Sequence, residues 1–249
     1  MKDNLYIKDY EASYYAIDQR KRLDPKAILD YITECNLIYA RTYGIALEEL
    51  HKKGYTMVLQ KAEISFNRPI YLGEKFSVAV GIQGVKGSSI IRQGSVITAN
   101  NEVICKSRGL VYVIDINTRK VAPMPDFVNE AYNIINDENI FEFKVIPPVN
   151  RIDYYKEFDV RYSDLDLNNH VNNSIYLGWA LETFPLEFLN SHSLKKARIL
   201  YMKEVFYGER VRVVAEEVSS EAGLKTIHQI KNSEGVVTTL LECTWENYI

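Results

Sequence analysis

The 249-residue sequence predicts an α+β fold of two tandem antiparallel sheets, each wrapped around a long helix. Two segments, 62–78 and 197–213, match when offset by 135 residues, with five of seventeen positions identical. Each half also opens with an alternating strand, continues with an apolar helix and ends in further alternating strands. Because both the sequence and the order of elements repeat, we expect a duplicated domain.

The first half is expected to form one long helix and several strands. Ile28, Leu29, Ile32 and the apolar residues after them recur at helical spacing, which predicts a helix from Lys26 to roughly Lys52. The alternating apolar runs predict strands at Tyr10 to Asp18, Met57 to Phe66, Phe76 to Val85, Ser88 to Ala99 and Val103 to Ile114.

The second half repeats this order. Its helix is expected from Val171 to Phe184, where Pro185 ends it, and the stretch through Leu189 can resume a helix. The predicted strands are Phe158 to Tyr162, Ala197 to Val205, Val211 to Val218, Leu224 to Lys231 and Val236 to Trp245. In both halves a Gly-Glu pair, at 73–74 and at 208–209, predicts a turn between two strands.

A polar segment separates the two halves. Pro123, Pro125, Pro147 and Pro148 bracket it, and a short helix is expected within it from Asp126 to Ile135. We therefore expect an N-terminal domain over 1–125, a linker over 126–150 and a C-terminal domain over 151–249.

Composition narrows the class of protein. With 47% hydrophobic and 25% charged residues the chain resembles a soluble globular protein, and a net charge of −3 favours neither a nucleic acid nor a membrane as partner. No apolar run approaches the ~20 residues of a transmembrane helix, and the N-terminus has no apolar signal core, so we expect a cytoplasmic protein. Cys35, Cys105 and Cys243 are odd in number and widely spaced, which predicts packing rather than a disulfide framework or a zinc cluster.

Residues 163–173 carry two carboxylates, four amides and an imidazole in eleven positions. Asp164, Asp166, Asn168 and His170 fall on every second residue, so in an extended backbone they would point to one side. Such a density of polar groups beside an apolar helix is expensive unless each group is hydrogen-bonded. The segment is therefore either an elaborate helix start or an active site.

The helix that follows offers a place for a carbonyl oxygen. The N–H groups of Val171, Asn172 and Asn173 are expected to be unpaired and to carry the positive end of the helix dipole. They could bind an oxygen that gains negative charge during a reaction.

The side chains could supply acid–base chemistry. Asp166 could orient His170, Asn168 could hold a water or the carbonyl, and Glu204 could act as a general base. The alternative is that the asparagines are capping and turn residues and that His170 is a hydrogen-bonded interface histidine. The first half has Asp18 to Pro25 at this place, without a histidine or an asparagine cluster, and Pro69 where the repeat has Glu204. Because these polar residues occur in the second half and not in the first, a functional role is favoured over a folding role.

The segment Asp164 to Pro185 resembles the active-site segment of acyl-ACP thioesterases, which release fatty acids from acyl carrier protein in plants and bacteria. The resemblance implies a double hotdog fold, in which each hotdog is a sheet wrapped around one helix. It also implies hydrolysis of the fatty acyl-ACP thioester to free fatty acid and holo-ACP, with no metal or other cofactor. The catalytic residues of the family fall on Asp166, Asn168, His170 and Glu204. Plant members carry a Cys after that Glu, whereas Val205 stands here, which removes a Cys–His mechanism.

The implied partner is acyl carrier protein with its 4'-phosphopantetheine-linked acyl chain, with neither nucleic acid nor membrane as partner; a homodimer is left open. Because the carrier is acidic, these basic residues are a candidate docking face, with a solvated charged face as the alternative: Lys195, Lys196, Arg198, Lys203, Arg210 and Arg212. In the family the N-terminal hotdog supplies much of the acyl tunnel. Candidate wall residues, with ordinary core as the alternative, are Ile32, Leu37, Tyr39, Tyr43, Met57, Leu59 and Ile64.

Three rival functions stay open at this point. A hotdog acyl-CoA thioesterase would share the chemistry, a hotdog dehydratase would use His and Asp on α- and β-protons, and a non-catalytic module would bind the acyl chain or its carrier. Acyl chain length, saturation preference and the docking residues are not readable from the sequence.

Overall fold

The computed structural model describes residues 5–86, 89–98, 102–132, 143–220 and 223–247. The chain divides into two compact units. Unit 1 contains Met1–Ala62 and Asn67–Phe143, and unit 2 contains Glu63–Phe66 and Lys144–Ile249.

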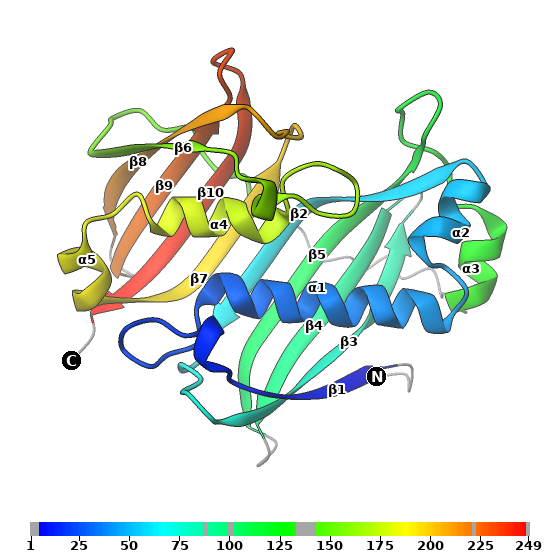
Figure 1. Cartoon of the computed structure of the whole chain (residues 1–249), viewed down its shortest axis with the longest axis horizontal. Coiled ribbons are helices and arrows are strands. Elements are labelled where there is room, and N and C mark those ends of the chain that lie inside the picture. Colours follow the sequence, from blue (N-terminus) through cyan, green and yellow to red (C-terminus); the bar gives the residue numbers. More distant parts are fainter. Residues whose placement is uncertain (1–4, 87–88, 99–101, 133–142, 221–222, 248–249) are drawn as a thin grey trace. The chain divides into compact units, whose positions relative to one another are not determined.

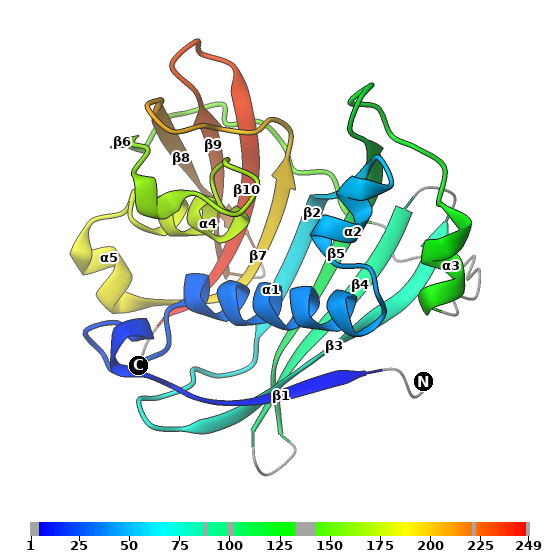
Figure 2. The ribbon, with the colours of Figure 1, turned by 45° about the vertical axis from the view of Figure 1, so that its right-hand side comes forward.

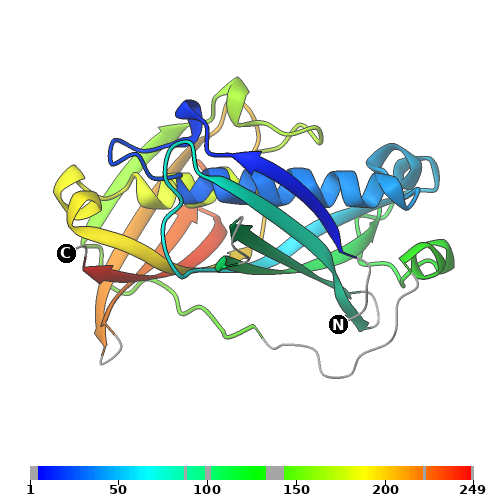
Figure 3. The same cartoon turned by 90° about the horizontal axis from the view of Figure 1, so that it is seen from below.

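Unit 1 is a sheet with one long helix. Its elements are β1 (Tyr6–Glu11), the 3-10 helix η1 (Tyr14–Ala16), α1 (Pro25–Thr42), α2 (Leu47–Lys52), β2 (Tyr55–Phe66), β3 (Lys75–Lys86), β4 (Ser89–Thr98), β5 (Val103–Asp115) and α3 (Asp126–Tyr132); the last four residues of β2, Glu63–Phe66, group with unit 2. The strand order is β1-β3-β4-β5-β2, and β1, β3, β4 and β5 pair antiparallel. Helix α1 packs on β3 and β1 and runs along one face of these strands (Figure 1; Figure 3).

Helix α1 has a defined start and a defined end. The Asp24 carboxylate accepts the backbone N–H of Lys26 at 2.8 Å, and Pro25 occupies the first helical position. The expectation of one helix as far as Lys52 is wrong, because the chain breaks at Gly44, where φ is +70°. Glycine adopts this left-handed conformation without a steric cost and so ends α1 before the short α2 begins.

Unit 2 repeats the same order of elements. They are β6 (Tyr154–Asp159), the 3-10 helix η2 (Tyr162–Asp164), α4 (Asn173–Leu181), α5 (Leu186–Ser191), β7 (His192–Tyr201), β8 (Arg210–Ser220), β9 (Gly223–Lys231) and β10 (Val237–Asn247). The strand order β6-β8-β9-β10-β7 reproduces that of unit 1. Helix α4 packs on β8 and β10 (Figure 2). The predicted pair of antiparallel sheets, each with its helix, is therefore confirmed as a double hotdog.

The turns that the repeated Gly-Glu pairs predicted are also confirmed. Gly73 and Gly208 have φ of +78° and +86°, which explains the glycine at both places. The glutamate after each glycine accepts the backbone N–H three residues before it: Tyr71 donates to Glu74 at 3.1 Å and Phe206 to Glu209 at 2.8 Å.

Several boundaries differ from those expected. Strands β1 and β6 begin four residues before Tyr10 and Phe158, and β7 ends at Tyr201, so Glu204 lies on a loop rather than on a strand. Helix α3, expected in a linker over 126–150, groups with unit 1. The last part of the helix expected to reach Ile135 lies outside the described residues.

Each core lies between the helix and the sheet of its unit. In unit 2 it contains Leu177 of α4 with Ile199, Ile230 and Leu241 of the strands, all at most 1% exposed. The three cysteines are reduced and buried, as their predicted packing role requires. In the described part of the chain no helix is long and apolar enough to span a membrane.

Candidate active site

The polar segment forms a tight loop between η2 and α4. The N–H of Asp166 donates to the carbonyl of His170 at 2.9 Å, and the N–H of Asn169 donates to the carbonyl of Asp166 at 3.1 Å. Asn169 closes the loop with φ of +62°, a conformation that asparagine tolerates better than most residues. The expectation of an extended backbone with alternating side chains is therefore wrong.

Asp164 consequently serves the fold and lies apart from the other polar side chains. It is 1% exposed, and its carboxylate accepts both the backbone N–H of Arg161 at 2.9 Å and the guanidinium of Arg161 at 2.7 Å. Its own carbonyl accepts the N–H of Asn172 at 2.8 Å. These bonds tie the start of the loop to the start of α4.

We predict that Asp164→Ala lowers the free energy of unfolding by about 2 kcal/mol, because a buried acceptor of several charged and backbone donors is lost. The folded variant should keep its kcat, measured well below its unfolding temperature. Asp159→Ala is the control, because Asp159 forms an exposed ion pair with Arg210. The side chains of Asp159 and Arg210 are 71% and 60% exposed. The control should cost less than about 1 kcal/mol. Loss of turnover at unchanged stability in Asp164→Ala would contradict the assignment.

Asp166, His170 and Glu204 converge around the imidazole. Nδ1 of His170 lies 3.5 Å from Oδ1 of Asp166, and Nε2 lies 3.9 Å from Oε1 of Glu204. The side chains of His170, Asp166 and Glu204 are 19%, 24% and 30% exposed, so all three are partly open to solvent. Thirty-four residues separate His170 from Glu204, and the bridge between His170 and Phe206 brings the two loops together.

Asn168 stands at the outer side of this group. Its backbone N–H donates to Oδ1 of Asp166 at 2.7 Å, its amide nitrogen donates to Oδ2 at 3.4 Å, and its side chain is exposed. The amide is thus held by one end and can turn its oxygen or nitrogen to a ligand. Among the described residues, no group of three or more His, Cys, Asp or Glu side chains could hold a metal ion.

The hydrogen bonds at the start of α4 differ from those expected for the carbonyl-binding site. The N–H of Val171 donates to the carbonyl of Val205 at 2.9 Å and that of Asn172 donates to Asp164, so the expectation that both are unpaired is wrong. Asn172 is the N-cap, and its side chain accepts the N–H of Ser174 at 3.3 Å. In the part of the chain that the structure describes, the N–H of Asn173 is given no acceptor, and it sits at the positive end of the α4 dipole.

Unit 1 contains the same loop with other side chains. Asp18 corresponds to Asp166: its N–H donates to the carbonyl of Arg22 at 2.7 Å, its carboxylate accepts the N–H of Arg20 at 2.8 Å, and Lys21 has φ of +59°. The N–H of Leu23 donates to the carbonyl of Ile70 at 2.7 Å, as that of Val171 does to Val205. The backbone of the loop therefore belongs to the fold of both units.

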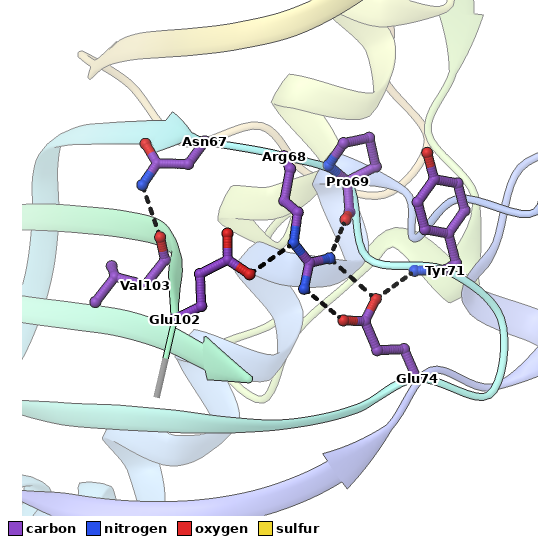
Figure 4. A network of polar contacts seen from close by, with 7 residues as sticks. All are labelled: Asn67, Arg68, Pro69, Tyr71, Glu74, Glu102 and Val103. Carbon is purple, nitrogen blue, oxygen red and sulfur yellow. Dashed lines mark hydrogen bonds and ion pairs between the residues drawn. The ribbon is translucent and has the colours of Figure 1, made fainter. Parts of the chain in front are cut away.

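The side chains differ at the reactive positions. Arg20 and Arg22 stand where unit 2 has Asn168 and His170, and Arg22 is paired with Asp18 at 2.6 Å. The counterpart of Glu204 is Pro69. Its neighbour Arg68 donates to the Pro69 carbonyl and binds Glu74 and Glu102, which leaves an ion-pair network where unit 2 has an acid–base group (Figure 4).

Most of the basic residues of the candidate docking face have an acidic or aromatic partner. Arg198 is 8% exposed and is bonded to Glu242, so it cannot form part of an open surface. Among the other candidates, the partners within unit 2 are Glu246 for Lys195, Glu63 for Lys196, Asp159 for Arg210 and the Tyr155 ring for Arg212. Lys203 is exposed on the loop that carries Glu204.

The candidate tunnel residues also divide. Ile32, Tyr39 and Ile64 are buried, whereas Leu37 is 50% exposed on α1 and is not a wall residue. Tyr39 and Tyr43 pack with Tyr132 of α3, with ring centroids 5.0 to 5.5 Å apart. Met57 and Leu59 of β2 are half-buried.

Residues 150–247 match the family model of the acyl-ACP thioesterase C-terminal domain, and residues 25–132 match that of the thioesterase-like superfamily. The half of the chain that carries the polar loop therefore belongs to the acyl-ACP thioesterase family. The chain is 24% identical over 258 residues to a dodecanoyl-[acyl-carrier-protein] hydrolase of Umbellularia californica, covering 97% of this chain and 67% of that protein. It spans about half of a Cuphea viscosissima acyl-[acyl-carrier-protein] hydrolase, with 80% of this chain and 52% of that protein aligned at 24% identity.

Solved structures agree with the fold. An acyl-ACP thioesterase of Bacteroides thetaiotaomicron superposes with a TM-score of 0.85 at 24% identity, over 98% of each chain. A Lactobacillus plantarum protein superposes with a TM-score of 0.94 at 22% identity, over 98% of this chain and 97% of its own.

Two residues near the site escaped sequence reasoning. The Tyr201 hydroxyl donates to the carbonyl of Asn173 at 2.9 Å, and the Tyr176 hydroxyl faces the backbone N–H of Val205. The repeat contained a signal for the first, because Tyr201 aligns with Phe66, which differs only in the hydroxyl.

Proposed function

We propose that the thioesterase hydrolyses fatty acyl-acyl carrier protein, releasing free fatty acid and the holo carrier. The observation that carries the proposal is the convergence of Asp166, His170 and Glu204 beside the first turn of α4, in a chain of this family. Neither the fold nor the loop backbone requires these side chains, since unit 1 builds both with other residues.

The thioester carbonyl oxygen binds at the N–H of Asn173. As the oxygen gains negative charge, the α4 dipole and this donor stabilise it more than they stabilise the neutral ester. Asn168 supports the oxygen or the attacking water with its exposed amide.

Water is activated at the other side of the carbonyl. Glu204 takes one proton from water while the water oxygen bonds to the carbonyl carbon. When the C–S bond breaks, the proton passes from Glu204 to the departing sulfur, which leaves as the thiol of the carrier. His170, whose Nδ1 lies 3.5 Å from the Asp166 carboxylate and 3.3 Å from the Val171 carbonyl, orients the water and stabilises the charge that develops. The 3.9 Å between Nε2 and Glu204 leaves the pair to tighten when substrate binds, as is common in unliganded sites.

The test is hydrolysis by the purified protein of acyl-ACP and of acyl-CoA with the same acyl chain. We expect a kcat/KM for acyl-ACP at least tenfold above that for acyl-CoA, because the carrier protein adds contacts that a nucleotide lacks. Mass spectrometry of the carrier should show the holo form as its only new product.

Three outcomes would contradict the proposal. A higher kcat/KM for acyl-CoA would make the protein an acyl-CoA thioesterase. Enoyl product from 3-hydroxyacyl-ACP, without free acid, would make it a dehydratase. Binding of acyl-ACP without turnover would make it a binding module.

A further inference from the structure

The peptide that joins Glu204 to Val205 is held from two sides. The Val205 carbonyl accepts the N–H of Val171, the residue directly after His170. The Val205 N–H faces the hydroxyl of Tyr176, in the first turn of α4. Val205 is 0% exposed, so its N–H is shielded from water beside this phenol. The backbone position of Glu204 is thereby set by the two elements that hold the rest of the site.

A second hydroxyl ties α4 to the same segment. Tyr201, the last residue of β7, donates to the carbonyl of Asn173, the residue with the open N–H. The rings of Tyr176 and Tyr201 meet edge to face, with centroids 5.6 Å apart and an interplanar angle of 81°. Glu204 follows Tyr201 by only three residues, so a shift of the Tyr201 hydrogen bond would also move the backbone of Glu204.

Both hydroxyl groups are missing from the copy that lacks the site. The loop alignment that pairs Asp18 with Asp166 pairs Ile28 with Tyr176, and the strand alignment pairs Phe66 with Tyr201. Ile28 of α1 and Phe66 of β2 are 4% and 8% exposed, so both apolar side chains stay buried and only the phenol oxygens are absent. The fold does not need the oxygens.

Resting on the proposed function, we propose that Tyr176 and Tyr201 are positioning residues, whose hydroxyl groups keep Glu204 in register with His170 and with the first turn of α4. Burial raises the pKa of the Tyr176 phenol, and the charges of Glu204, Glu209 and Asp166 raise it further. Tyr176 therefore stays neutral and keeps its hydrogen-bonding role throughout the working pH range.

The test uses Tyr176→Phe and Tyr201→Phe, which remove one oxygen each and keep the ring. We expect each to lower kcat for acyl-ACP about tenfold with KM within twofold, because a small displacement of Glu204 weakens the reaction more than substrate binding. Tyr154→Phe is the matched control: it removes another hydroxyl of unit 2, bonded to Glu217 at 2.8 Å, and should leave kcat unchanged. Phe66 shows that phenylalanine suits the position of Tyr201 in this fold, so a folded variant is available.

A double-mutant cycle separates positioning from a general loss of structure. In a Glu204→Gln background, Tyr176→Phe and Tyr201→Phe should each lower kcat by less than a further twofold, since the group they position is already gone. A kcat within twofold of wild type in the single variants would overturn the inference, and so would the same tenfold loss in the Glu204→Gln background. A wild-type protein without acyl-ACP hydrolysis would instead refute the proposed function itself.

Discussion

Replacing Glu204 by glutamine is expected to lower kcat for acyl-ACP hydrolysis by about 10³-fold, within the range that general acid–base groups contribute. Glutamine has nearly the same shape and can still accept a hydrogen bond, but it cannot take the proton of water. KM should change less than threefold, because the open N–H of Asn173 does not depend on the charge of residue 204. Single-turnover hydrolysis of a radiolabelled acyl-ACP, with enzyme in excess, measures a loss of this size.

Glu187→Gln on α5 is the control for Glu204→Gln. Glu187 is an exposed glutamate of the same unit, in the first turn of a helix away from the loop, and the change should leave kcat within twofold. If Glu204→Gln kept more than a tenth of the wild-type kcat, Glu204 could not be the base of this reaction.

The second large effect is expected from pH and concerns stability. His228 on β9 is 0% exposed: one ring nitrogen lies 2.9 Å from Oγ1 of Thr226, and the other, Nδ1, has no hydrogen-bond partner among the described residues. Phe184 packs edge to face on the ring at 5.3 Å. Burial in these surroundings lowers the pKa of His228 from 6.5 to about 3, because a charged imidazolium would lose its hydration.

The sign follows from proton binding. Between pH 6.5 and about 3 the unfolded chain carries a proton on His228 that the folded chain does not, so acid favours unfolding. The contribution of His228 to stability is complete above pH 6.5 and falls by about 1.4 kcal/mol for each pH unit below it, or about 3 kcal/mol at pH 4.

Urea denaturation of the wild type and of His228→Gln from pH 7 to pH 4 measures this effect. At pH 7 we expect the variant to have a lower free energy of unfolding than wild type. Its free energy of unfolding should then decrease less steeply with acid, because its unfolding takes up one proton fewer, so the two curves converge in acid. His51→Gln, at an exposed position of α2, should run parallel to wild type. Parallel curves for wild type and His228→Gln would contradict the prediction.

Local patterns were sufficient for much of the fold. Each strand of both sheets overlaps a predicted alternating run, although β1 and β6 share only two residues with theirs. The repeated segments predicted a sheet around a helix built twice, and the matching strand orders confirm the repeat. Errors fell where one residue decides a boundary. Apolar spacing continues past Thr42, but the left-handed Gly44 ends α1 there.

Residue types picked out the candidate site, whereas its geometry required the structure. A dense polar segment with a resemblance to acyl-ACP thioesterases picked out Asp166, Asn168, His170 and Glu204, which the structure brings to one loop pair. The same pattern included Asp164, which is buried in bonds to Arg161. Asp164 and Asp166 are the same residue type within one regular spacing, so the sequence pattern does not show which of them is buried. The turn at Asn169 leaves no periodic signal in the sequence.

The amino-acid sequence by itself determined the duplicated α+β fold and the placing of acid–base residues in one copy only, because periodicity, repeats and residue types are local properties. The tertiary structure decided how those groups are held. It joins Val171 to Val205 and Asn172 to Asp164, brings no acceptor among the described residues to the N–H of Asn173, and places the Tyr201 hydroxyl on the carbonyl of Asn173. Most of these choices depend on hydrogen bonds between residues about thirty positions apart, and such partners exist only after the chain has folded.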